Sequence, residues 1–235
     1  MELEKILQRQ GFGTRKGCRA LIRAGRVAVN GEVCDNPFVD LPTDGLVLTI
    51  DEIAWPYREF ATLMLNKPAN HECSRRPVHH PSVLSLLPPP LLERGVQPIG
   101  RLDEDTTGLL ILTDDGQLNH VLSSPKKRIA KVYLATTKHP VDAAQIDALL
   151  AGVVLHDDPE PVRAAACEVV EDRLLRLTIT EGKYHQVKRM VAAAGNRVEA
   201  LHRVALGDLV LPADLKPGEW RWLEPADLEA LGYAP

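Results

Sequence analysis

The stretch GRLDEDTTGLLILTDDG, residues 100–116, contains five acidic side chains and a single basic one, Arg101. Asp103 follows Arg101 by two residues and stands shortly before the apolar run LLILT. A carboxylate beside a permanent cation stays ionised, and it can then attack a carbon atom or stabilise a developing cation. The same residues also suit an ordinary ion pair in an acidic loop, with Asp114 and Asp115 as turn formers. The pattern alone therefore leaves a chemical and a structural interpretation of Asp103 open.

A second concentration of charge lies in the first 31 residues, where seven Lys or Arg residues stand against Glu2 and Glu4. Thr14 can cap a helix in which Cys18 and Ile22 are spaced for burial, together with Leu21. This spacing leaves five cations on the solvent-facing positions: Arg15, Lys16, Arg19, Arg23 and Arg26. They could contact phosphates, which would make binding salt-sensitive, or they could form a solvated helix face.

The elements around these cations predict a small α/β domain. Leu3, Ile6 and Leu7 share one helical face, GFG ends that helix, and the second helix follows it. Asn30-Gly31 is a strong two-residue hairpin turn after a short alternating strand. The strand LVLTI ends near residue 50, so we place one domain in residues 1–58 and a second in residues 59–235.

The second domain shows more strands than helices. The strands are TLMLNKP, LLILT, KVYLATT, GVVLH, CEVV and LLRLTIT, and the helices lie near VDAAQIDALLA and YHQVKRMVAAAG. Short turns join several of the strands, so we expect an α+β fold built on a mostly antiparallel mixed sheet. The Pro/His-rich stretch RRPVHHPSVLSLLPPP predicts an irregular, exposed loop.

Composition excludes several classes of protein. The chain of 235 residues is 45% hydrophobic and 26% charged, as in soluble globular proteins, and its net charge of −4 argues against blanket affinity for nucleic acid. The charged start MELEKILQRQ is unlike a signal peptide, and no apolar run could span a bilayer. We therefore expect a cytoplasmic protein with no membrane partner. The scattered cysteines lack a C-x-x-C pair, and His71, His79 and His80 lack zinc-site spacing, so we expect no metal.

Four motifs in order make the interpretation more specific. Together with LNKP (65–68), KVYLATT (131–137) and EGKYHQVKRMVAAAGNRVEALHR (181–203), the stretch 100–116 resembles the signature of the RsuA-type pseudouridine synthases, isomerases that act on ribosomal RNA. The order helix, helix, GRVAVNG resembles the RNA-binding domain named after the fourth small-subunit ribosomal protein. The two resemblances cover essentially the whole chain. They imply the pseudouridine synthase fold for the second domain and a reaction without a cofactor.

The resemblance also implies roles for single residues. Asp103 matches the essential aspartate and Tyr133 the tyrosine that stacks on the flipped uracil. Lys188 matches the cation paired with the aspartate, and Arg189 is the neighbouring candidate for that position. Arg101 would fill the gap left by the flipped base or contact a phosphate; its structural alternative is an ion pair with Asp105. The residues expected to bind RNA are Arg101, Arg15, Lys16, Arg19, Arg23, Arg26, Lys67 and Arg189.

Two departures from the family pattern concern the loop after LNKP and the start of the chain. Asn70 stands where the family commonly has glycine, but asparagine tolerates left-handed backbone angles, so we expect the turn to persist. Glu2 and Glu4 stand where the RNA-binding domain usually has a basic residue and an aspartate. Glu2 is therefore expected to weaken the grip on RNA at that point.

The implied substrate is one uridine of 16S ribosomal RNA, either free or in a small-subunit assembly intermediate, and we expect a monomeric enzyme. The wording of the motifs and the lack of a long basic tail favour 16S over 23S ribosomal RNA, which is the alternative substrate. A second alternative is an RNA-binding or assembly factor that has lost the reaction. The joint presence of Asp103, Tyr133 and Lys188 argues against that alternative.

Overall fold

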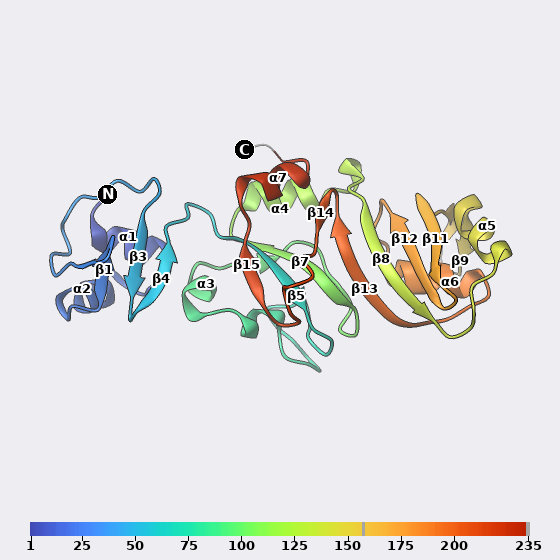
Figure 1. Cartoon of the computed structure of the whole chain (residues 1–235), viewed down its shortest axis with the longest axis horizontal. Coiled ribbons are helices and arrows are strands. Elements are labelled where there is room, and N and C mark those ends of the chain that lie inside the picture. The colour runs from blue at the N-terminus through green and yellow to red at the C-terminus, as the bar shows by residue number, and fades with distance from the viewer. Residues whose placement is uncertain (157, 234–235) are drawn as a thin grey trace. The chain divides into compact units, whose positions relative to one another are not determined.

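The computed structural model describes residues 1–156 and 158–233 and divides into two compact units (Figure 1). Unit 1 comprises Met1–Ala61 and Leu87–Gln97, and unit 2 comprises Thr62–Leu86 and the described residues from Pro98 onward. Residues 87–97 thus lie with the N-terminal unit, whereas the sequence-based division had assigned them to the second domain.

Unit 1 consists of two helices and a four-stranded antiparallel sheet in the order β2-β1-β3-β4, followed by the separate helix α3. The elements are α1 (Leu3–Arg9), α2 (Arg15–Arg23), β1 (Val27–Val29), β2 (Glu32–Val33), β3 (Val47–Ile50), β4 (Ile53–Pro56) and α3 (Pro89–Glu93). Thr14 caps α2 as predicted, because its hydroxyl accepts the amide hydrogen of Gly17 at 3.2 Å. Asn30 and Gly31 have φ of 50° and 88°, the left-handed values that a two-residue hairpin turn requires.

A buried glutamine explains why residues 87–97 belong to unit 1. The side-chain oxygen of Gln10 accepts hydrogen bonds from the Trp55 indole at 3.2 Å and from the Arg94 guanidinium at 3.0 Å. Gly11, at φ +86°, allows the chain to pass close to α3, since a Cβ there would lie 2.0 Å from the carbonyl oxygen of Pro90. No motif in the sequence predicts that residues 87–97 pack against the N-terminal residues of unit 1.

Unit 2 is built on a mixed sheet whose central path runs β11-β12-β8-β13-β7-β5-β15. Its strands are β5 (Thr62–Lys67), β7 (Thr107–Thr113), β8 (Lys131–Thr137), β11 (Ala166–Glu171), β12 (Leu174–Ile179), β13 (Val198–Leu206) and β15 (Trp220–Trp222). Two short strands attach to it: β14 (Leu209–Val210) pairs with β13, and β6 (Gln97–Pro98) pairs with β7. Along the central path only β13 and β7 run parallel within the described residues, so the expected mostly antiparallel mixed sheet is confirmed.

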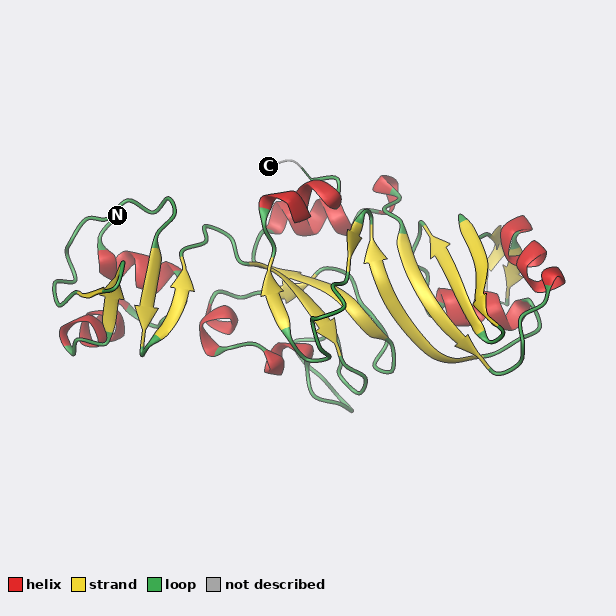
Figure 2. Ribbon diagram, viewed as in Figure 1, coloured by secondary structure: helices red, strands yellow, loops and turns green. Residues whose placement is uncertain are grey.

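Helices cover this sheet at two places (Figure 2). α4 (Gly116–Ser123) packs on β7, with α7 (Pro225–Ala230) drawn beside it, and α5 (Ala143–Ala151) and α6 (Gln186–Ala193) lie at the end of the sheet that carries β11. A separate hairpin, β9 (Val153–Leu155) with β10 (Asp158–Val162), contacts α6. Asp115, predicted to be a turn former, accepts the amide hydrogens of Gln117 and Leu118 and so acts as the N-cap of α4.

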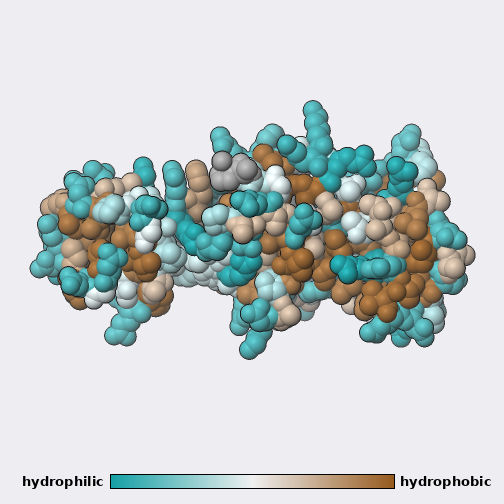
Figure 3. All heavy atoms as spheres, turned by 45° about the horizontal axis from the view of Figure 1, so that its top comes forward, coloured by the Kyte–Doolittle hydropathy of each residue, from teal (hydrophilic) through white to brown (hydrophobic). Residues whose placement is uncertain are grey.

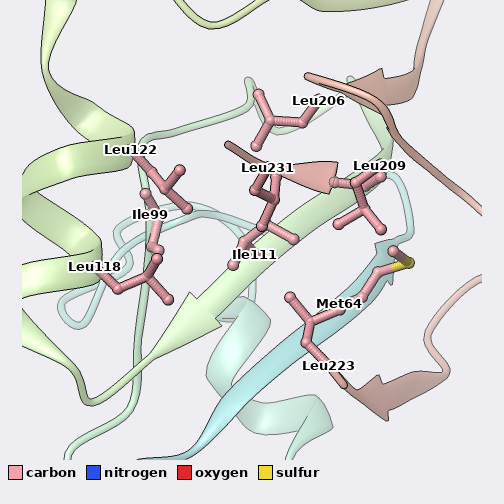
Figure 4. Close-up of a cluster of buried hydrophobic side chains, with 10 residues drawn as sticks. Met64, Ile99, Ile111, Leu118, Leu122, Leu206, Leu209, Leu223 and Leu231 are labelled. Carbon is pink, nitrogen blue, oxygen red and sulfur yellow. The ribbon is translucent and has the colours of Figure 1, made fainter. Parts of the chain in front are cut away.

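An apolar core of unit 2 lies between the strands β5 and β7 and the helices α4 and α7 (Figure 4). The cluster contains Met64 of β5, Ile111 of β7, Leu118 and Leu122 of α4, and Leu231, which follows α7. All of these side chains are buried. Because interiors pack as densely as organic crystals, this core holds β7 rigidly, and with it the loop that precedes β7.

The Pro/His-rich stretch is more ordered than its sequence predicts. It contains a 3-10 helix, Val83–Leu86, and its last two residues begin α3, so the prediction of an irregular loop is wrong for residues 83–86 and 89–90. Asn70 has φ of 58°, and the left-handed turn expected there is confirmed. Polar residues cover much of the face in Figure 3, with apolar areas between them. Among the described residues, no helix combines the length and hydropathy that a membrane-spanning segment needs.

Candidate active site

Asp103 lies in the loop before β7 and faces two basic side chains from the start of α6. Nζ of Lys188 lies 3.1 Å from Oδ2 of Asp103, and Nε2 of His185 lies 3.4 Å from Oδ1. The Asp103 side chain is 28% exposed, so it is partly shielded yet reachable. The site thus brings together an acid and a lysine that are separated by 85 residues in the chain.

The carboxylate borders a cavity of about 230 Å³ in unit 2. Its lining includes Arg101, Asp103, Lys131, Tyr133, His185 and Arg203. Tyr133 is 7% exposed and lies on β8, where Leu177 of β12 and Arg203 of β13 are its neighbours across the sheet. Two of the three residues expected to be catalytic, Asp103 and Tyr133, therefore line one cavity, and the third, Lys188, is bonded to Asp103.

Lys188 joins two carboxylates at once. Besides Asp103, its ammonium donates to Oδ1 of Asp105 at 2.6 Å. Burial by itself would lower the pKa of Lys188, but the hydrogen bonds to Asp105 and Asp103 outweigh it and raise that pKa. Asp105 therefore pairs with Lys188, so the ion pair between Asp105 and Arg101, the structural alternative for Arg101, is not formed. Arg101 is exposed at the cavity.

Lys67 anchors the loop that contains Asp103 through hydrogen bonds to its backbone. Its side chain is fully buried, and its ammonium donates to the carbonyl oxygens of Pro68, Glu104 and Thr106 at 2.8–3.0 Å. Burial lowers the pKa of Lys67. The expectation that Lys67 binds RNA is wrong, because a buried ammonium with three carbonyl partners cannot reach a phosphate.

A second carboxylate orders the neighbouring loop. Glu72 accepts the backbone amide hydrogens of His80, His79 and Val78, and these bonds lower the pKa of Glu72 to about 2. Nε2 of His80 lies 3.6 Å from a carboxylate oxygen of Glu104, the residue after Asp103. The histidines that could have suggested a metal thus belong to a loop built around Glu72, and the described residues contain no group of three potential metal ligands.

The cations of unit 1 fall into two groups. Arg19 forms an ion pair with the buried carboxylate of Glu4, and Arg26 pairs with Asp51 at 2.6 Å. Arg15 lies 3.8 Å from Glu4 but remains exposed, as do Lys16 and Arg23. Arg19 is therefore mainly a structural residue, because its guanidinium satisfies a buried acid.

Three further features of the site were not predicted. His185 approaches Asp103 from a left-handed backbone position, with φ of 49°. Arg203 is 4% exposed, donates from Nε to the carbonyl oxygen of Leu109, and leaves its buried Nη2 without a partner. Arg189, expected to contact RNA, donates to the carbonyl oxygen of Tyr184 at 3.0 Å. The one available signal in the sequence was that His185 and Arg203 lie within the basic motif, residues 181–203.

The fold and the site define the class of protein. Residues 61–193 match the RNA pseudouridylate synthase family, and residues 1–37 match the S4 domain. The chain belongs to the RNA pseudouridylate synthase family and carries an N-terminal S4 domain. It is an isomerase that converts uridine in RNA to pseudouridine.

Its relatives cover nearly the entire chain. The chain is 38% identical over 231 residues to the ribosomal small subunit pseudouridine synthase A of Haemophilus influenzae, covering 98% of this chain and 99% of that protein. It is 40% identical over 234 residues to the protein of the same name from Escherichia coli K12, covering 98% and 100%. A crystal structure of a pseudouridylate synthase matches with a TM-score of 0.70 and 37% identity, covering 98% of this chain and 99% of that one.

Proposed function

We propose that this enzyme isomerises one uridine of 16S ribosomal RNA and that Asp103 is its essential catalytic residue. The observation that carries the proposal is the contact of Asp103 with Lys188 at the edge of the cavity that Tyr133 lines. The names of the relatives from Haemophilus influenzae and Escherichia coli support the small ribosomal subunit as the source of the substrate.

The reaction moves one bond without adding or removing atoms. The N1–C1′ bond of the nucleotide breaks, the uracil turns within the cavity, and C5 then bonds to C1′. The proton on C5 is removed and a proton is placed on N1, so the product is an isomer of the substrate. The carboxylate of Asp103 either bonds to a carbon of the sugar or base, or stabilises the cation that develops on the ribose.

Lys188 and Tyr133 have distinct parts in this chemistry. The ammonium of Lys188, whose pKa is raised, stays charged and lies 3.1 Å from the carboxylate of Asp103, so it holds that carboxylate at the edge of the cavity. Tyr133 offers a ring face against which the uracil can stack and a phenol that can help to remove the C5 proton. Tyr133 lines the cavity beside Arg203 of the neighbouring strand β13, and this position supports both roles.

The target uridine must leave its stack before it meets Asp103. Flipping requires a few kcal/mol, less in an irregular RNA region, and this difference favours loops and bulges as targets. Arg101, exposed at the rim of the cavity, can then fill the vacated space or contact a phosphate. The exposed cations Arg15, Lys16 and Arg23 of the S4 domain would add phosphate contacts.

The enzyme is proposed to work as a monomer in the cytoplasm. The test is to incubate the purified protein separately with 16S ribosomal RNA, 23S ribosomal RNA and a small-subunit assembly intermediate, and to map pseudouridines. We expect one new pseudouridine in 16S ribosomal RNA, free or in the intermediate, and none with the Asp103→Asn variant. Product confined to 23S ribosomal RNA would reject the substrate, and RNA binding without product would show a non-catalytic RNA-binding factor.

A further inference from the structure

Tyr184 is a large aromatic side chain that the reaction above does not use. It is 75% exposed, although it immediately precedes His185, which touches Asp103. Aromatic rings usually bury most of their area, so a ring this exposed beside a nucleic-acid site is a candidate for direct contact with the substrate.

The ring of Tyr184 is held in a fixed place. Its centroid lies 3.8 Å from that of the His185 ring, with 20° between the two planes, so the rings are stacked. Neighbouring residues in a regular helix do not face each other, and here the left-handed backbone of His185 makes the stack compatible with the chain. The guanidinium of Arg189 also binds the Tyr184 carbonyl oxygen at 3.0 Å and ties the turn to α6.

The stacked rings of Tyr184 and His185 lie between solvent and the carboxylate of Asp103. One face of the Tyr184 ring rests on His185, and Nε2 of His185 lies 3.4 Å from Asp103. Three quarters of the Tyr184 side chain remain open, and no other ring contact to it occurs among the described residues. The open face is therefore free to receive a further flat group close to the place where a uridine is flipped.

We propose that Tyr184 is a stacking platform for an RNA base next to the target uridine. Flipping a nucleotide out of its strand unstacks its neighbours, and a base that stacks on Tyr184 recovers part of the lost energy. Stacking on an aromatic ring accepts every base, so this contact strengthens binding and fixes the strand without reading its sequence. The inference rests on the activity proposed above and adds a binding position to it.

The test combines three variants at position 184 with a control elsewhere on unit 2. Tyr184→Leu removes the ring but keeps an apolar side chain, whereas Tyr184→Phe and Tyr184→Trp keep a flat face. Val170→Ala shortens an exposed side chain of the edge strand β11 and serves as the control. The melting temperature of each variant shows whether the fold is intact.

Affinity and turnover are measured on the 16S fragment that the wild-type enzyme modifies. We expect Tyr184→Leu to raise Kd and KM about tenfold, the effect of one lost base–aromatic stack, and to leave kcat within about threefold. Tyr184→Phe and Tyr184→Trp should keep the affinity within about twofold, and Val170→Ala should match the wild type. With 2-aminopurine placed in turn on each side of the target, one position should be quenched on binding by the wild type and not by Tyr184→Leu.

Several outcomes would overturn the inference. An unchanged Kd for Tyr184→Leu would do so, and so would an equal loss in Tyr184→Phe, which would assign the effect to the hydroxyl group. A loss in kcat alone would show that Tyr184 acts only by placing His185. If the wild type modifies no ribosomal RNA, the proposed activity itself fails, and the inference fails with it.

Discussion

Lys188 bonds to Asp103 and Asp105 at the same time, with distances of 3.1 Å and 2.6 Å from its Nζ to their oxygens. The two acids differ in exposure: the side chain of Asp103 is 28% exposed and that of Asp105 is 63% exposed. Only Asp103 also borders the cavity. Asp105 therefore helps to hold the lysine, and Asp103 is the carboxylate available to a substrate.

Replacing the lysine should slow the chemical step. We expect Lys188→Met to lower kcat by about a hundredfold or more, because the carboxylate of Asp103 loses the fixed positive charge that lies 3.1 Å away and holds it in place. Lys188→Arg should recover part of the rate, since it restores a permanent cation with a different shape. Single-turnover rates at saturating RNA measure the effect. A Lys188→Met variant with a wild-type rate would remove Lys188 from the site.

Replacing Lys67 should affect stability as well as rate. Lys67→Met leaves three carbonyl oxygens, that of Thr106 buried and those of Pro68 and Glu104 partly buried, without their common donor, which we expect to lower the free energy of unfolding by about 2–4 kcal/mol. The Asp103 loop loses its support, so kcat should also fall. Denaturant unfolding of Lys67→Met beside Lys127→Met, a change at an exposed lysine, gives the comparison. Equal stabilities of the two variants would contradict the role of Lys67 in holding the loop.

The loop around Glu72 should resist acid. The folded-state pKa of Glu72 is about 2, below its ordinary value of 4.5, so its stabilisation is complete above 4.5 and is lost as the pH falls through about 2. The carbon-13 resonance of the Glu72 side-chain carboxyl should therefore stay constant from pH 7 to 4 and move only below that. Movement of this resonance with a midpoint near 4.5 would contradict the prediction.

A variant of the same residue offers a second measurement. Glu72→Gln should destabilise the loop around residue 72 at any pH, because a neutral amide accepts the three backbone hydrogen bonds less strongly than a carboxylate does. Trypsin should then cleave faster after Arg75, which is exposed within the loop.

The two groups of cations in the S4 domain should respond differently to substitution. The double change Lys16→Ser and Arg23→Ser should weaken RNA binding and reduce the slope of log K against log salt by about 1–2, with the melting temperature unchanged. Arg19→Ser should instead lower the melting temperature, because it leaves the buried Glu4 carboxylate without its main partner. If Lys16 and Arg23 do not alter the salt slope, the S4 domain does not bind RNA through that helix.

The sequence predicted the elements well where local chemistry decides them. Thr14 caps its helix and Asn30-Gly31 makes its hairpin, because both signals act over a few residues. The motifs also named Asp103, Tyr133 and Lys188, but only a resemblance could link residues so far apart. Their proximity depends on the pairing of β13 with β7 and β8, which no single motif contains.

The unpredicted residues depend on contacts across the chain. Lys67 ends a strand in the sequence, where a lysine suggests exposure, yet the carbonyl oxygens of Glu104 and Thr106, from the distant Asp103 loop, and of the adjacent Pro68 converge on it. Arg19 was placed on a solvent-facing helix surface, and only tertiary packing brings it to Glu4. The helix pattern around YHQVKRM gave no sign that His185 adopts a left-handed conformation before α6 begins at Gln186.

The most direct test of the central claim is the single-turnover rate of Asp103→Asn with 16S ribosomal RNA held well above its Kd. The substitution keeps the shape of the side chain but removes its charge and its ability to bond to a carbon atom. We expect no detectable pseudouridine while the Kd for RNA stays within about threefold of the wild type, because the charge of a single residue at the cavity contributes little to a surface dominated by phosphate contacts. A rate within tenfold of the wild type would contradict the assignment of Asp103 as the essential catalytic residue.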